Sequence, residues 1–86
     1  MGNNSSQVVP DYSSVETDYL KRMAESGNSW AQLEYGLRCL KTSDTSENKL
    51  DVYRYALEWF ITSENNGNPK AGKYIDHCFK LTVLCA

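Results

Sequence analysis

Histidine and cysteine are the side chains of this sequence best suited to chemistry, and there are few of them. The 86 residues contain one histidine, His77, and three cysteines, Cys39, Cys78 and Cys85. Nucleophilic catalysis needs a nucleophile, a base within hydrogen-bonding reach of it and a group that orients the base. His77 is the single histidine base, and its neighbours Asp76 and Cys78 point about 100° away from it on a helix. We therefore expect a protein that is not an enzyme; the alternative is a small hydrolase or thiol enzyme that uses His77 with Cys39 or Cys78.

Neither the cysteines nor the glycines form a pattern that holds a metal, a cofactor or a phosphate group. Disulfide frameworks and zinc sites use even, closely spaced sets of cysteines, whereas this odd set has no CxxC pair. We expect the cysteines to be reduced and to serve as small apolar residues. The glycines of phosphate-binding loops follow a strand, whereas the two Gly-Asn pairs of this sequence do not. The sequence predicts no metal and no cofactor.

The first six residues, MGNNSS, match the pattern for N-myristoylation, in which Gly2 is the acceptor and Ser6 occupies the favoured hydroxyl position. A single acyl chain gives only weak membrane binding, and no polybasic patch supplies a second signal. Contact with a membrane is therefore expected only if Gly2 is acylated. The alternative is an ordinary unstructured start.

Composition narrows the class of protein. Hydrophobic residues make up 41% of the chain, charged residues 23%, and the net charge is -2. A chain of this length buries roughly 60–65% of its unfolded surface, which suffices for one small core. Scattered cations disfavour nucleic acid as a partner, and no segment has the features of a membrane span or a secretory signal. We expect one soluble, cytoplasmic domain.

Helix start and stop signals predict four helices that follow a flexible tail at residues 1–12. Ser13 and Glu16 form a capping box, a typical helix start, and the glycines of the Gly-Asn pairs are typical helix ends. The expected helices cover residues 14–26, 30–41, about 50–66, and 68 onward, with a polar loop at 42–48. The apolar residues 81–86 either extend the last helix or fold back on it. The folded domain is then 13–86.

The sequence repeats itself at an offset of 40 residues. This offset aligns Gly27-Asn28 with Gly67-Asn68, Ala31 with Ala71, and an aromatic-apolar pair, Tyr19-Leu20, with Trp59-Phe60. In each copy the aromatic pair can wedge between helices, Gly-Asn can form the turn, and alanine permits close approach after it. Such self-similarity is typical of helical repeat proteins.

Both copies resemble the portion of the Sel-one-like repeat, a relative of the tetratricopeptide repeat, that joins two helices. The matching segments are MAESGNSWAQLEYG at 23–36 and ALEWFITSENNGNPKA at 56–71. The chain departs from the family pattern at Tyr35, Asp76, Cys39 and Phe79, and only about one and a half repeats fit. The resemblance implies four antiparallel helices in an αα-superhelical stack.

The second predicted helix is apolar on two faces, with Ala31 and Tyr35 on one and Leu33 and Leu37 on the other. Either both faces belong to the core, which is typical of a helix inside a stack, or one face binds a partner. In the family the first helix of each pair lines the ligand-binding side. By resemblance this indicates the following contact candidates: Trp30, Leu33, Glu34, Leu37, Arg38, Tyr74 and His77.

These features predict a non-enzymatic protein-interaction module, an adaptor or an inhibitor that binds a protein partner through a helical face. A structural subunit of a larger assembly is a further alternative. A stack of repeats needs a polar cap at each end, yet residues 81–86 are apolar. We expect self-association, giving a homo-oligomer, or a partner to cover this end.

Overall fold

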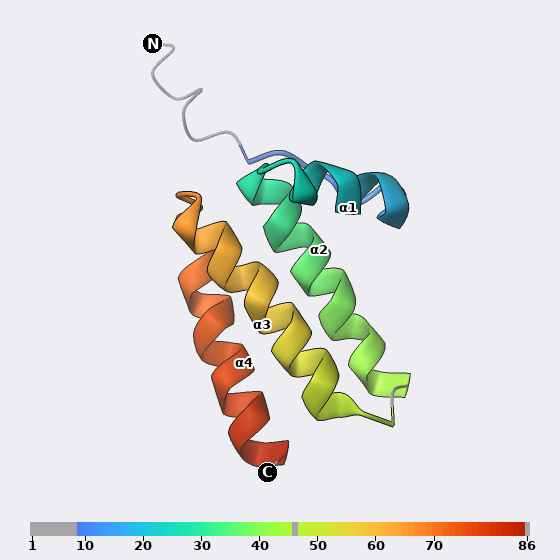
Figure 1. The fold of residues 1–86 in the computed structure, drawn as a ribbon, viewed down its shortest axis with the longest axis vertical. Coiled ribbons are helices and arrows are strands. Elements are labelled where there is room, and N and C mark those ends of the chain that lie inside the picture. The colour runs from blue at the N-terminus through green and yellow to red at the C-terminus, as the bar shows by residue number, and fades with distance from the viewer. Residues whose placement is uncertain (1–8, 46, 86) are drawn as a thin grey trace.

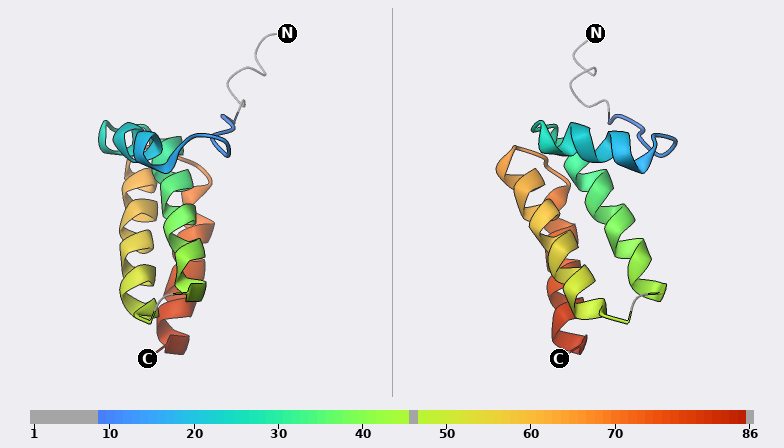
Figure 2. Two further views of the ribbon diagram at one scale, coloured as in Figure 1. Left: turned by 90° about the vertical axis from the view of Figure 1, so that its right-hand side faces the viewer. Right: turned by 45° about the vertical axis from the view of Figure 1, so that its right-hand side comes forward.

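Four α-helices form the fold in this computed structural model, which describes residues 9–45 and 47–85. They are α1 (Thr17–Glu25), α2 (Ser29–Lys41), α3 (Lys49–Asn65) and α4 (Ala71–Cys85), and a short 3-10 helix, η2 (Thr42–Thr45), follows α2 (Figure 1). No strand occurs among these residues, so the all-α prediction is confirmed. Helices α2, α3 and α4 run antiparallel to their neighbours, whereas α1 lies obliquely across the start of α2 (Figures 1 and 2).

The two Gly-Asn pairs form the same turn at the same end of the molecule. Gly27 and Gly67 have φ angles of 106° and 91°, a conformation that other residues avoid. In the first turn the Gly27 N–H donates to Ala24 and the Asn28 N–H to Met23; in the second, Gly67 donates to Glu64 and Asn68 to Ser63. This is the Schellman helix end, and it recurs at the predicted offset.

Polar side chains connect the two turns across helices. The Ser63 hydroxyl and the Asn68 amide both donate to the carbonyl oxygen of Ser29, at 2.7 and 3.2 Å. Buried Gln32 donates to the Ala24 carbonyl and accepts from the Asn66 amide. These bonds give the buried polar side chains their partners and join the first turn of α2 to the turn between α3 and α4.

The core lies on both sides of α2, which explains its two apolar faces. On one side Ala31 and Tyr35 pack against Leu20 and Ala24 of α1. On the other, Leu33 packs in the main cluster, whose remaining buried members are Ala56, Phe60, Ala71 and Cys78. Both faces of α2 are thus used within the chain.

Two predicted helix starts were wrong. Helix α1 begins after Glu16, whose side chain makes no cap bond, and the Ser13 N–H donates instead to the carboxylate of Asp11. The chain therefore closes a turn before α1, with the Val15 N–H bonded to the Tyr12 carbonyl, and this turn competes with the expected capping box. At the second Gly-Asn turn Pro69 lies in a turn, so α4 starts at Ala71, and residues 81–85 extend it.

Candidate functional site

The seven contact candidates lie on α2 and α4, and the structure places most of them against the core. Leu33 is buried, and Trp30, Leu37 and Tyr74 are half-buried against the main cluster. Tyr74 also stacks on the Phe60 ring, with ring centroids 5.5 Å apart. These four side chains mainly join α2 to α3 and α4.

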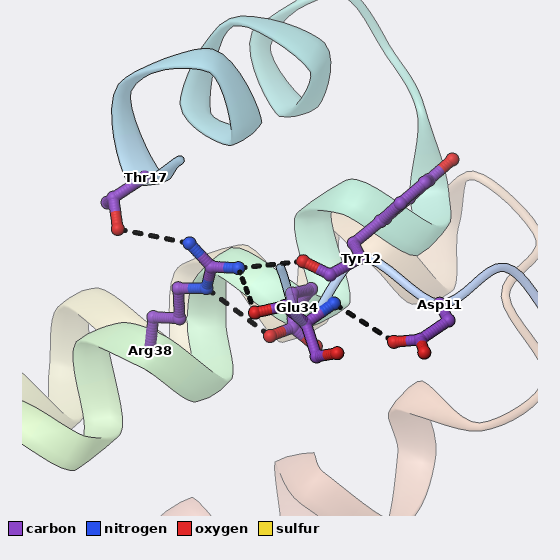
Figure 3. Close-up of polar contacts among 6 residues, drawn as sticks. Asp11, Tyr12, Thr17, Glu34 and Arg38 are labelled. Carbon is purple, nitrogen blue, oxygen red and sulfur yellow. Dashed lines mark hydrogen bonds and ion pairs between the residues drawn. The ribbon is translucent and has the colours of Figure 1, made fainter. Parts of the chain in front are cut away.

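The two charged candidates of α2 bind each other and the segment before α1. The Arg38 guanidinium donates to the Glu34 carboxylate at 3.3 Å, to the Tyr12 carbonyl at 2.7 Å and to the Thr17 hydroxyl at 3.1 Å (Figure 3). It also reaches the Ser13 carbonyl at 3.3 Å. The hydroxyl of Tyr12 accepts from the Asn28 amide, so this residue, which the sequence assigns to the tail, contacts the helices. Through these bonds Arg38 joins the segment that leads into α1 to helix α2.

Replacing Arg38 with alanine is expected to lower the free energy of unfolding by about 1–2 kcal/mol, because several carbonyl and carboxylate acceptors lose their donor. Lysine should restore only part of this, since one ammonium cannot reproduce the planar fork. Urea unfolding measures the loss. The control is Arg54→Ala, which removes an exposed arginine from α3 and should cost less than about 0.5 kcal/mol. Equal losses for the two alanine variants would contradict the role given to Arg38.

His77 and the described thiols lie in different environments. His77 is exposed on α4, whereas Cys78 is fully buried, and burial raises the pKa of its thiol to about 11. Burial also raises the pKa of Cys39, against a smaller opposing effect of the Tyr35 hydroxyl. A raised pKa keeps these thiols protonated, and the protonated thiol is the poor nucleophile. No group of three potential metal ligands occurs among residues 9–45 and 47–85.

A groove of about 410 Å³ lies between the start of α1, the second half of α2 and the first half of α3. Tyr35, Tyr55 and Trp59 meet edge to face beside it, with ring centroids 5.4 to 6.4 Å apart. Burial raises the pKa of Tyr35, and the hydrogen bond to Tyr55 adds to the effect. The groove is open, and its wall is mainly apolar.

The largest exposed apolar side chains of α4 are gathered near its C-terminal end. Phe79, Val83 and Leu84 are 56%, 71% and 82% exposed. Two grooves meet at Phe79 and Val83: one of about 330 Å³ runs between α3 and α4, and one of about 410 Å³ crosses the outer side of α4. We call this region the C-terminal apolar surface; it comprises Leu50, Leu57, Phe79, Val83 and Leu84, with Arg54, Lys80 and Thr82.

Part of this surface was visible in the sequence. The apolar segment 81–86 includes Val83 and Leu84, and it indicated an end of the fold that needs cover. Sequence reasoning missed Leu50, Leu57 and Phe79, because their helical spacing is the same as that of core residues. The mismatch between Phe79 and Cys39 in the repeat alignment was the available signal.

Comparison with family models, with curated proteins and with solved structures found no match to this chain. Among the described residues, no helix is both long and apolar enough to cross a membrane. Gly2, the predicted acylation site, lies outside the described residues.

Proposed function

We propose that this protein is a non-enzymatic interaction module that binds another protein through a helical surface, as an adaptor or an inhibitor. The C-terminal apolar surface is the observation that carries the proposal. Phe79, Val83 and Leu84 are large apolar side chains, more than half exposed and contiguous. On a small folded protein such a patch, hollowed and rimmed by charged side chains, is typical of an interface.

The contact surface in this proposal differs from the face that the family resemblance implies. The side chains of Trp30, Leu33 and Leu37 pack in or against the core. Glu34 and Arg38 form an ion pair with each other. His77 is exposed on α4 but lines neither groove of the proposed surface. Burial, which raises the pKa of both Cys39 and Cys78, supports binding over thiol chemistry. The recurring Schellman turns support the further proposal that the helices follow a Sel-one-like arrangement.

Site-specific photo-crosslinking tests the proposal in cells of the native host. A photoreactive phenylalanine analogue in place of Val83 is expected to yield one discrete adduct with another protein. The same analogue in place of Glu25, exposed on α1 at the opposite end of the molecule, should not yield it (Figure 1). Adding Phe79→Asp to the Val83 variant should abolish the adduct, because a buried unpaired carboxylate opposes docking.

The proposal fails if positions 83 and 25 give the same adducts, or if Val83 gives none. An adduct with twice the mass of the chain would show a self-associating protein instead of a module for another partner.

A further inference from the structure

The charges on the C-terminal apolar surface have one sign. Its charged lining residues are Arg54 of α3 and Lys80 of α4, and among the side chains that the structure describes no acidic one lines either groove. Both cations are exposed, and among the described residues neither forms an ion pair or a side-chain hydrogen bond. An apolar surface with one unpaired cation in each of its two grooves fits an apolar ligand that carries acidic groups beside its contact face.

The repeat indicates what kind of element covers such a face. On α2 the corresponding face is covered by a helix, since Gly36 lies directly against the Phe60 ring of α3. At the offset of 40 residues, Gly36 corresponds to Asp76, which is exposed, and half-buried Cys39 corresponds to Phe79, which is 56% exposed. On α4, no helix within residues 9–45 and 47–85 covers the face that corresponds to the one α3 covers on α2. Asp76 lies outside both grooves, and its carboxylate would repel an acidic ligand. On α4 such a ligand is therefore expected to contact only the last two turns.

We infer that the C-terminal apolar surface binds an amphipathic α-helix of another protein, with Asp or Glu flanking its apolar stripe. This inference rests on the proposed function and specifies the partner. Such a helix would place apolar side chains in the grooves beside Phe79 and Val83, and its carboxylates near Arg54 and Lys80.

Two other occupants fit the surface less well. A bilayer surface would gain little attraction from two cations, because firm electrostatic binding to anionic lipid takes a cluster of them. A second copy docked through a two-fold axis at Phe79 would bring Arg54 and Lys80 close to their own counterparts, and like charges repel.

Two synthetic helical peptides of about 16 residues test the inference by amide chemical shifts and dissociation constants, measured on the full chain. Both carry the same leucine stripe; one has glutamate at the flanking positions and the other lysine. The glutamate peptide is expected to bind at least about tenfold more tightly, since two attractive contacts replace two repulsive ones. Its shifts should centre on Leu50, Leu57, Phe79 and Val83.

Charge reversal provides the matched control. The double variant Arg54→Glu/Lys80→Glu should reverse the preference and favour the lysine peptide. Lys41→Glu/Lys70→Glu changes the net charge equally at exposed lysines outside both grooves, and the original preference should persist. This pair separates a local contact from an effect of overall charge.

Four results would overturn the inference: equal affinity for the two peptides, no binding of either, anionic phosphatidylserine vesicles bound through Phe79, or concentration-dependent shifts at the surface without peptide. The vesicle result would identify a membrane contact, and the last result a second copy. If Val83 crosslinks to a protein while the peptides are not distinguished, the proposed function stands and only the acidic helix is wrong. If Val83 gives no adduct, the proposed function itself fails.

Discussion

Replacing Phe60 with alanine is expected to lower the free energy of unfolding by about 3–5 kcal/mol. Phe60 is fully buried on α3, stacks on Tyr74 of α4 and lies against Gly36 of α2. Its ring therefore joins three helices, and its removal leaves a cavity that no single neighbour can fill. Small domains have about 5–15 kcal/mol of stability in total, so this one change removes a large share of it.

Urea unfolding followed by far-ultraviolet circular dichroism measures the loss. The control is Ile61→Ala at the next position of α3, where the side chain is 39% exposed and should cost about 1 kcal/mol or less. Phe60→Leu, which keeps much of the volume, should lie between the two. Equal losses for Phe60→Ala and Ile61→Ala would show that the centre of the core lies elsewhere.

The sequence was most informative where one residue type satisfies one local requirement. Gly27 and Gly67 need positive φ angles at helix ends, and both turns lie where the Gly-Asn pairs predicted them. Asn28 caps α2 by accepting from the Trp30 and Ala31 amides, a local contact that favours asparagine before the first turn of a helix. These features depend only on contacts between residues that are close in sequence, so the local sequence is enough to predict them.

Prediction was poorer where distant residues decide the structure. The capping box at Ser13 was a sound local pattern, but the turn before α1 is held by Arg38, which lies 25 residues further along the chain. Tyr12 was assigned to the tail because no apolar period surrounds it, and its partners on α2 are remote in sequence. Such contacts cannot be read from periodicity.

The candidate surface illustrates the same limit. Helical spacing indicates which residues of α2 and α4 share a face, but not which neighbouring element covers that face. The sequence left open whether one face of α2 binds a partner or both belong to the core, and the structure fills both from within the chain. Phe79 has the spacing of a core residue, yet no described segment covers it. Whether a face with this spacing is buried or exposed depends on how many helices pack around it.

Gly36 explains how closely α2 and α3 can pack. A Cβ atom at this position would lie 2.6 Å from Cε1 and 2.9 Å from Cδ1 of Phe60, well inside van der Waals contact. In the repeat alignment the matching residue of α4 is Asp76. Helix α4 can carry a side chain there because nothing in the described chain packs against that point.

Gly36→Ala is therefore expected to destabilise the protein by about 1–3 kcal/mol, although alanine is the better helix former. The added methyl group would clash with the Phe60 ring, which lies between α2 and Tyr74 of α4 and must leave that position to relieve the clash. Unless the ring moves away, the two helices must separate and lose buried contacts along their length. Urea unfolding gives the size of the effect.

Gly72→Ala is the matched control, because it makes the same change in the first turn of α4. Its added Cβ would lie 3.2 Å from a carboxylate oxygen of Glu64, the mobile end of an exposed side chain that can move aside. The gain in helix propensity should then dominate and stabilise the protein by up to about 1 kcal/mol. The two Gly→Ala changes are thus expected to have opposite signs. If Gly36→Ala were also stabilising, α2 and α3 could not be packed as closely as the Phe60 contact requires.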